Sequence, residues 1–310
     1  MFKLRTGYFI SGIATGLILL FTFLATLPDG KLHIFFCNVG QGDGAYIKLP
    51  DGRDMVVDGG PNNRILDCLS RHMPFWDRRI NLVMMSHPQK DHAQGLIEVL
   101  RRYSVEYFLR SDVANTTDGY KELISVVQEK KIPVRYLTKG EKIDVGATTL
   151  SVIWPSKEQI AKGPRESLVT IGSSDDSTNI LGSQAVEDLN DYSIVFWLRY
   201  GSFDALFTGD ADTRVEDGYV GTKLADNQVE VLKFPHHGSK TGASTSFIDW
   251  LAPKLTVISV GKNSYGHPTQ EAINLLKESS IVRTDQEGDV EVVSDGRSWH
   301  VRSNTTKEEK

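Results

Sequence analysis

The sequence predicts a layered α/β domain that follows an apolar N-terminal segment. Apolar runs of strand length alternate with helix-like segments over most of the chain. Several of these runs end in a loop that contains histidine or aspartate. The composition beyond the first thirty residues is that of a globular protein, and 310 residues suit one large domain or two small ones.

The N-terminal segment predicts a membrane anchor over residues 1–29. Lys3 and Arg5 precede Gly7 to Leu27, a stretch of 21 residues without charge, and roughly 20 apolar residues cross a bilayer core. Cations before the stretch favour a cytoplasmic N-terminus, which in a bacterium gives a single-pass cell-membrane protein with an extracytoplasmic body. A cleaved signal, which would leave a secreted protein, is the alternative, although residues 25–28 match a cleavage site poorly.

The charge and the cysteines limit the expected chemistry. A net charge of −5 lacks the basic footprint usual for a nonspecific nucleic-acid binder, although a local basic groove is compatible with it. We expect Cys37 and Cys68 to be small buried hydrophobic residues, one on a strand and one on a helix. Pairing of the two in an oxidising compartment is the less favoured alternative. Neither cysteine neighbours the histidines, so we expect no thiolate ligand.

The domain is expected to span residues 30–302. Its first part reads as strands at 32–38, 45–49, 54–57 and 80–85, with helices at 64–71 and 96–103. Further strands are expected at 106–109, 134–137, 141–145, 148–154, 193–200, 204–208, 229–234, 255–260, 290–293 and 298–301. Further helices are expected at 120–130, 213–219, 246–251 and 269–278.

Two segments break this alternation. Residues 155–190 are polar and weakly periodic, which predicts a mobile insertion that could rim a site. The polar residues 303–310 predict a disordered tail.

Histidine and aspartate cluster in the loops that follow apolar runs. Five of the eight histidines fall in three such loops, and Asp210 follows a fourth run. The five histidines are His87, His92, His236, His237 and His267. Because ligands of α/β sheets bind at the carboxyl ends of strands, we expect these side chains to converge on one edge.

These residue types suit a metal centre. Imidazole nitrogens and carboxylate oxygens are ligands for zinc, manganese or iron. A divalent ion can lower the pKa of a bound water from 15.7 to about 7, on the order of 12 kcal/mol towards hydroxide at neutral pH. The sequence therefore predicts a centre with one or two divalent ions, zinc or manganese.

These residues also carry a resemblance to a known family. His87-x-Gln89-x-Asp91-His92 resembles the His-x-[His/Asp]-x-Asp-His motif of metallo-β-lactamase-fold hydrolases. Five further blocks are similar to the C-terminal metallo-hydrolase domain of the competence protein ComEC. They are Asn38-Val39-Gly40-Gln41-Gly42-Asp43, Val57-Asp58-Gly59-Gly60, Thr208-Gly209-Asp210, Pro235-His236-His237-Gly238-Ser239 and Asn263-x-Tyr265-Gly266-His267-Pro268.

The resemblance implies a four-layer αββα sandwich and a set of site residues. By motif match the metal ligands are His87, Asp91, His92, a bridging Asp210, and one of His236 and His237. His267 is implied as a further ligand or as a general acid, so Asp91 and His267 are the expected catalytic residues. Asp58 is implied as a support for the ligand loop, and Lys240 and Asn263 as candidates to contact a phosphate oxygen.

Two positions depart from the family pattern. Gln89 stands where relatives carry His or Asp, so it is a doubtful ligand that brings no charge. Asn190 lies where many hydrolases of this fold carry another histidine. The ligand set is therefore complete for one metal and incomplete for a second.

Three functions are compatible with these observations. The first is a membrane-anchored, extracytoplasmic, metal-dependent phosphodiesterase that acts on DNA, with DNA-uptake or envelope proteins as partners, as the resemblance implies. The second keeps this chemistry but acts on phosphorylated cell-surface polymers. The third is a non-catalytic binding module whose metal site is degenerate. Metal content and an activity assay discriminate among the three.

Overall fold

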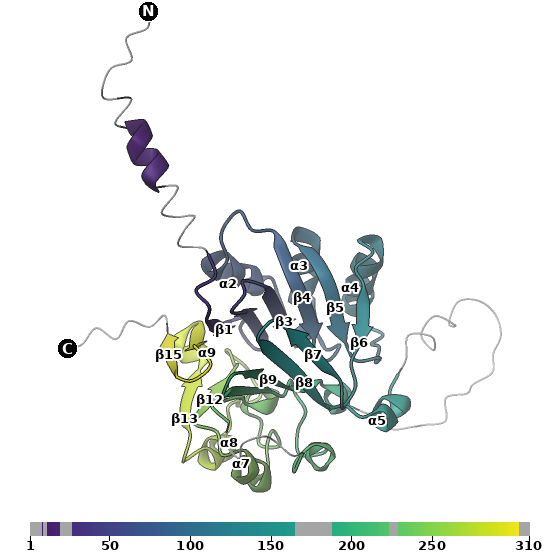
Figure 1. Cartoon of the computed structure of the whole chain (residues 1–310). Coiled ribbons are helices and arrows are strands. Elements are labelled where there is room, and N and C mark those ends of the chain that lie inside the picture. Colours follow the sequence, from purple (N-terminus) through teal and green to yellow (C-terminus); the bar gives the residue numbers. More distant parts are fainter. Residues whose placement is uncertain (1–7, 9–10, 19–26, 165–187, 223–228, 304–310) are drawn as a thin grey trace, which may run out of the picture.

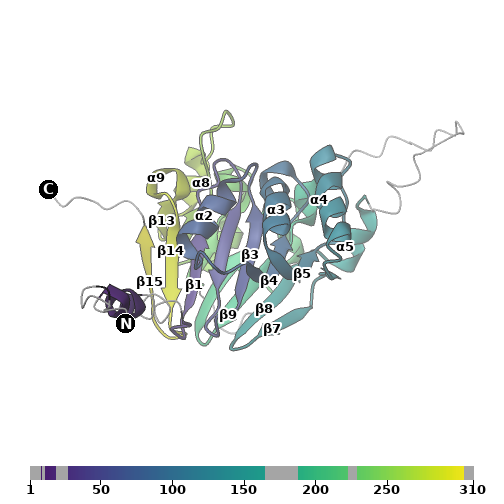
Figure 2. The same cartoon turned by 90° about the horizontal axis from the view of Figure 1, so that it is seen from above.

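A computed structural model of the chain describes residues 8, 11–18, 27–164, 188–222 and 229–303. Two β-sheets lie face to face, and helices cover the outer face of each (Figures 1 and 2). The layers follow the order helix, sheet, sheet, helix, as expected.

The first sheet holds most of the N-terminal half of the chain. Its strand order is β15-β14-β1-β2-β3-β4-β5-β6. The strands are β1 (Leu32–Phe36), β2 (Gly44–Lys48), β3 (Asp54–Gly59), β4 (Arg79–Met85), β5 (Ser104–Arg110), β6 (Val134–Tyr136), β14 (Val290–Ser294) and β15 (Trp299–Ser303). The C-terminal hairpin β14–β15 thus returns to the first sheet, where β14 pairs with β1.

The second sheet has the order β13-β12-β11-β10-β9-β8-β7. Its strands are β7 (Lys142–Val145), β8 (Thr148–Trp154), β9 (Val195–Tyr200), β10 (Phe203–Phe207), β11 (Val231–Lys233), β12 (Leu255–Ile258) and β13 (Ser280–Arg283). Each sheet therefore combines antiparallel strands with a run of parallel ones.

The helices divide between the two outer faces. The described helices are α2 (Arg64–His72), α3 (Lys90–Arg102), α4 (Asp118–Glu129), α5 (Lys157–Lys162), α7 (Thr245–Leu251), α8 (Gln270–Leu275) and α9 (Thr284–Glu287). Short 3-10 turns are η1 (Leu189–Tyr192), η2 (Glu216–Gly218) and η3 (Pro235–Gly238). Helices α2, α3 and α4 pack on the first sheet, while α7 and α8 pack on the second.

Strand β4 shows why the sheets are buried on both faces. Leu82 and Met84 belong to the core between the sheets, whereas Val83 and Met85 belong to the core beneath α2, α3 and α4. Successive side chains of a strand point to opposite faces, so an unbroken apolar run is what a doubly covered strand requires. The parallel strands place their carboxyl ends at one edge, which fixes where the loops after β3, β4, β10, β11 and β12 meet.

Several predicted boundaries are wrong. Helix α3 begins at Lys90, inside the segment expected to be a loop, and the carbonyl oxygen of Gln89 already accepts hydrogen bonds from the backbone of His92 and Ala93. The helix expected over 213–219 is only the turn η2. Strand β13 and helix α9 were not predicted at all. The insertion expected at 155–190 includes a short helix, α5, whose first turn is capped by the hydroxyl of Ser156.

The remaining segment predictions fall mainly outside the described residues. Residues 165–187 of the insertion and 304–310 of the tail belong there. So do 1–7, 9–10 and 19–26 of the predicted anchor. Within the described part of the chain, no helix has both the length and the apolar character that a membrane span requires. The transmembrane helix therefore stays a prediction from sequence.

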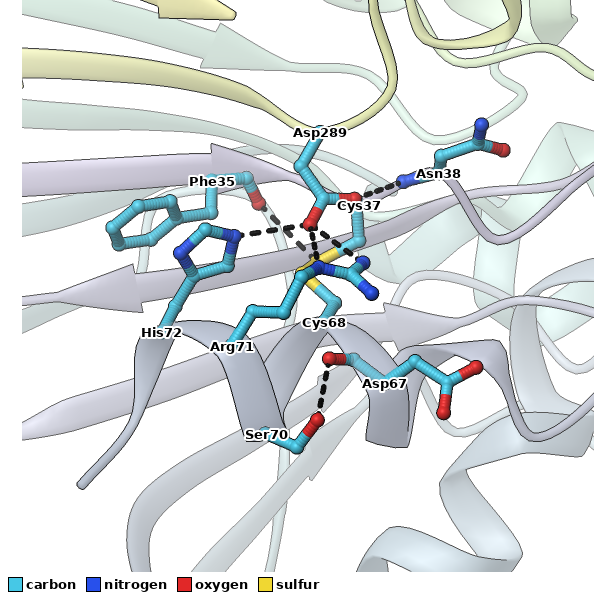
Figure 3. Close-up of a disulfide and its surroundings, with 9 residues drawn as sticks. All are labelled: Phe35, Cys37, Asn38, Asp67, Cys68, Ser70, Arg71, His72 and Asp289. Atoms are coloured by element: carbon cyan, nitrogen blue, oxygen red, sulfur yellow. Dashed lines mark hydrogen bonds and ion pairs between the residues drawn. A yellow bond between two sulfur atoms is a disulfide. The ribbon is translucent and has the colours of Figure 1, made fainter. Parts of the chain in front are cut away.

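The cysteine prediction is corrected by a disulfide between Cys37 and Cys68 (Figure 3). Helix α2 packs over the sheet and brings the two Cα atoms to 5.8 Å, although 31 positions separate them in sequence. Nearby, the carboxylate of Asp289 accepts hydrogen bonds from the Arg71 side chain and from the Asn38 backbone, and it lies 3.0 Å from Nε2 of His72. The pairing depends on packing between distant segments, which residue pattern alone does not report.

Candidate metal centre

Four side chains from three segments that follow strands meet at the carboxyl edge of the sheets. Asp91 and His92 lie in the first turn of α3, Asp210 follows β10, and His237 lies in η3 after β11. One ligand atom from each residue lies within 4.8 Å of the others. The convergence expected from the strand ends is therefore present.

Asp210 is central to this cluster. Its two carboxylate oxygens lie 3.2 Å from Nε2 of His92 and 3.3 Å from Nε2 of His237. His237 Nε2 also lies 3.3 Å from Oδ2 of Asp91. Three of the four side chains are almost fully buried, and Asp91 alone is partly exposed, so the cluster opens to solvent on the side of Asp91.

The backbone of η3 distinguishes the two adjacent histidines. His236 and His237 have φ values of 50° and 53°, in the left-handed region. Such a conformation costs on the order of 1–3 kcal/mol per residue and is found where the surrounding structure requires it. The result is that His237 points into the cluster at 2% side-chain exposure, while His236 remains 26% exposed.

A layer of hydrogen bonds behind the cluster orients the imidazoles. The carboxylate of Asp58 lies 2.8 Å from Nδ1 of His92 and accepts hydrogen bonds from the backbone and hydroxyl of Ser86. Nδ1 of His237 lies 3.0 Å from the carbonyl oxygen of Ser259 and 3.2 Å from Asp43. With Nδ1 held in this way, Nε2 of each ring is directed at the cluster.

Asp43 and Lys233 complete this layer and were not predicted. The ammonium of Lys233 pairs with the carboxylate of Asp43 and donates to the carbonyl oxygen of Gly209 over 2.8 Å. The Lys233 side chain is only 3% exposed. The signal in the sequence was a lysine within the apolar run Val231-Leu232-Lys233-Phe234, since a lysine is almost never fully buried without a partner.

The protonation of the cluster follows from opposing effects. Burial alone would raise the pKa of the Asp210 carboxyl, but the neighbouring His237 and His92 hold it well below its ordinary value. Burial alone would lower the pKa of His92, but Asp210 and Asp58 raise it well above its ordinary value. Burial opposes the charged form of His237 too, but Asp210 and Asp43 raise the pKa of His237 well above its ordinary value. The imidazoles thus carry protons that a metal ion would displace on binding.

The donor set fits one divalent cation. Asp91, His92, Asp210 and His237 offer two carboxylates and two imidazoles, which suit zinc, manganese or iron. With neutral histidines, the carboxylates of Asp43, Asp58, Asp91 and Asp210 outnumber the Lys233 ammonium by three charges, and one divalent ion reduces this excess to one. Without an ion, protons on His92 and His237 offset most of this excess, and a divalent ion that displaces those protons would take over that role.

Gln89 and Asn190, the two positions that depart from the family pattern, contact other polar side chains. Gln89 donates to Asp188 over 3.2 Å, and Nδ2 of Asn190 lies 3.5 Å from Nε2 of His236. Arg214 lies 3.0 Å from Asp188 and 2.9 Å from Asp212 and so holds this polar group together. Gln89 and Asn190 therefore contact polar side chains outside the four-residue cluster.

His87 lies beside His92. Its ring centroid is 4.1 Å from that of His92, and it is fully buried. Nε2 of His87 has no hydrogen-bonding partner among the described residues. Burial lowers the pKa of His87 to about 3, so the ring is neutral and its free nitrogen is available to a ligand.

Three further predicted site residues differ in their surroundings: His267, Asn263 and Lys240. The His267 ring lies 5.8 Å from that of His236, and burial together with His236 lowers the pKa of His267. Both amide hydrogens of Asn263 are used within its own loop, on the carbonyl oxygens of Gly261 and His267. Asn263 therefore shapes the His267 loop through its amide group, and its contact with a phosphate oxygen stays a prediction from sequence. Lys240 is exposed just beyond η3.

A hollow of about 760 Å³ opens beside Asp91. Its wall includes Gln41, Lys90, Lys262 and Tyr265, and the Tyr265 side chain is 73% exposed. The two lysines place positive charge in the wall of the hollow, beside the Asp91 carboxylate that also lines it.

Comparison with known proteins confirms the expected resemblance. The chain is 23% identical over 299 residues to ComE operon protein 3 of Bacillus subtilis (strain 168), covering 89% of this chain and 34% of that protein. It is 24% identical over 287 residues to Recombination protein 2 of Haemophilus influenzae, covering 89% and 31%. It is 36% identical over 104 residues to Competence protein ComA of Neisseria gonorrhoeae, covering 33% and 15%. The chain thus spans about a third or less of each relative, and no family model matches it.

Among solved structures, the metallo-β-lactamase-fold protein YhfI from Bacillus subtilis superimposes with a TM-score of 0.51 at 11% identity. The match covers 85% of this chain and all of that one. The fold is therefore a mixed α/β sandwich of the metallo-β-lactamase type.

Proposed function

We propose that the chain is a membrane-anchored, extracytoplasmic, metal-dependent phosphodiesterase that acts on DNA. The observation that carries the proposal is the convergence of Asp91, His92, Asp210 and His237 at the sheet edge, beside an open hollow with two lysines. The similarity to competence proteins supports DNA as the substrate.

Two features support export. The disulfide Cys37–Cys68 is typical of an oxidising compartment, and the uncharged stretch from Gly7 to Leu27 has the length of a membrane span.

The residues of the centre and of the hollow would have different roles in the reaction. Asp91, His92, Asp210 and His237 would hold a divalent ion, which supplies Lewis-acid activation of a phosphate oxygen and of water. Asp58 and Asp43 keep the two imidazoles in one orientation. His267, with Nδ1 unpartnered in the described structure, can ligate or exchange a proton at the phosphate. Lys90 and Lys262 attract the polyanion towards the hollow.

The test measures metal content and cleavage on the full-length protein. Purified without chelator, it should contain close to one equivalent of zinc, manganese or iron. It should cleave single-stranded or double-stranded DNA and bis(p-nitrophenyl) phosphate, and chelation should abolish both activities. Asp91→Ala is the inactive control, and Asp118→Ala, an exposed position on α4, is its matched counterpart.

Three outcomes would contradict the proposal in different ways. A metal content below a tenth of an equivalent would contradict the proposed metal-dependent enzymatic activity. Cleavage of the small diester without cleavage of DNA would favour a phosphorylated surface polymer as substrate. DNA binding without cleavage in metal-loaded protein would favour a binding module.

A further inference from the structure

An exposed aromatic pair lies on the loop between α2 and β4. Phe75 is 79% exposed and Trp76 is 45% exposed. Their rings meet edge to face with centroids 4.7 Å apart, so they form one apolar projection. Neither the core clusters of the described residues nor the metal centre includes this pair.

Cations flank this projection. The aromatic pair is followed by Asp77, which is partly buried, and then by Arg78 and Arg79, which are exposed. The guanidinium of Arg78 lies 5.8 Å from the centroid of the Tyr103 ring, and this contact holds the loop against the domain. Bulky aromatic residues beside arginines have the composition of side chains found at a membrane–water interface.

The loop lies at the end of the domain where the N-terminal segment arrives. His33 at the start of β1 pairs with Lys48 at the end of β2, which pairs with Asp54 at the start of β3. Strands β3 and β4 are parallel, so β4 also starts at this edge. Three strand spacings of about 4.8 Å place the beginning of β4 roughly 14 Å from the entry of the chain.

The connection between the apolar stretch and the domain is short. The uncharged stretch ends at Leu27 and β1 starts at Leu32. The four residues between them can span at most about 18 Å. Part of this length is already fixed, because the carbonyl oxygen of Gly30 accepts a hydrogen bond from Tyr200 and Pro28 lies against Gly52.

We infer that the domain rests on the lipid bilayer through Phe75, Trp76, Arg78 and Arg79, with the metal centre facing away from the membrane. The inference rests on the anchor included in the proposed function, and it does not depend on the hydrolase activity. With the stretch from Gly7 to Leu27 in the bilayer, the short connection holds this end of the domain at the interface. The metal centre lies at the opposite end of β4, whose seven residues span about 23 Å.

The orientation has a consequence for the substrate. A polymer outside the cell reaches the hollow beside Asp91 without passing between the domain and the bilayer. The anionic headgroups attract the two arginines, while the aromatic rings enter the interfacial layer.

The test uses the full-length protein in nanodiscs of phosphatidylglycerol and phosphatidylethanolamine. Lipids with a nitroxide near the headgroup should quench part of the tryptophan emission. Trp76→Phe should lose a large part of this lipid-dependent quenching, and Trp299, which pairs with Ser294 beside the start of β1, should account for the rest. Trp154→Phe, which alters a buried tryptophan at the metal-centre end of β8, should keep it. Hydrogen exchange of residues 74–79 should be slower in nanodiscs than in detergent.

The outcomes separate the inference from the proposal on which it rests. If alkaline carbonate extracts the protein from membranes, the anchor fails and the inference fails with it. If the protein stays inserted but Trp76→Phe retains the full quenching and residues 74–79 exchange equally fast in nanodiscs and in detergent, the docking surface alone is wrong. Protection of residues 74–79 only when a second membrane protein is present would also overturn it.

Discussion

The carboxylate of Asp58 lies 2.8 Å from Nδ1 of His92, on the side of the imidazole opposite to the metal cluster. Asp58 has a φ of 56°, a left-handed conformation that aspartate and asparagine adopt more readily than most residues. The same carboxylate holds the loop after β4 through Ser86. One side chain thereby fixes both the position of the ligand loop and the orientation of a ligand.

Asp58→Asn tests this support. The amide keeps the shape and tolerates the backbone conformation, but it removes the negative charge that favours His92 as a ligand. We expect metal affinity to fall about 10- to 100-fold while the fold is retained. Competition titration with a chromophoric chelator measures the affinity, and circular dichroism checks the fold. An unchanged affinity would contradict the role given to Asp58.

We expect Gln89 and Asn190 to limit the centre to one metal ion. Both lie where ligands of a second ion are expected, and both are engaged in hydrogen bonds or contacts with neighbouring side chains. We expect the wild type to bind one equivalent of metal and the double variant Gln89→His/Asn190→His to bind a second. Elemental analysis after dialysis measures both. Gln94→His, on α3, serves as the control and should leave the stoichiometry at one.

The buried pair of Lys233 and Asp43 is expected to show strong coupling. Lys233→Met removes the partner of a buried carboxylate, and breaking such a pair costs about 3–5 kcal/mol of unfolding free energy. The double variant Asp43→Asn/Lys233→Met removes both charges and should recover most of that loss. Urea denaturation of the wild type, the single variants and the double variant measures the coupling. Additive losses would mean that the two side chains act independently.

The disulfide should contribute to stability through the loop that it closes. For a sequence separation of 31 residues, loop-closure entropy predicts about 3–4 kcal/mol. We expect a reductant to lower the unfolding free energy of the wild type by about this amount. The variant Cys37→Ala/Cys68→Ala should be equally destabilised without reductant and should not respond to it. Equal stability of the oxidised and reduced wild type would contradict the prediction.

Asp54 should give the stability an unusual dependence on pH. Burial raises the pKa of the Asp54 carboxyl to about 6, although Tyr46 donates a hydrogen bond to it over 2.8 Å. An unfolded aspartate titrates near 3.9, so between about pH 4 and pH 6 the folded state binds more protons and this residue's contribution to stability falls as pH rises. Asp54→Asn should therefore be about 1–3 kcal/mol more stable than the wild type at pH 7 and similar to it at pH 4. Thermal melts across this range check the sign.

The local sequence pattern predicts which strand ends carry the candidate site residues. An apolar run followed by histidine or aspartate is visible in the sequence, and parallel pairing of β10 with β11 and of β11 with β12 then brings Asp210 and the histidine pair to one edge. Helix α3 was recognised by its apolar spacing, but its first turn was not. Asp91 and His92 belong to that turn, whose first backbone hydrogen bonds are accepted by the carbonyl oxygen of Gln89.

The sequence by itself determined the α/β class, the loops that carry the site and the residue types suited to a metal ion. Only the tertiary structure decided which histidine of the pair points inward, that Lys233 neutralises Asp43, and that Cys37 meets Cys68. The physical reason is that apolar periodicity and turn residues act over a few positions, whereas these three relationships depend on how distant segments pack. Histidine is among the residues enriched in the left-handed region, but two successive residues in it are held there by their surroundings.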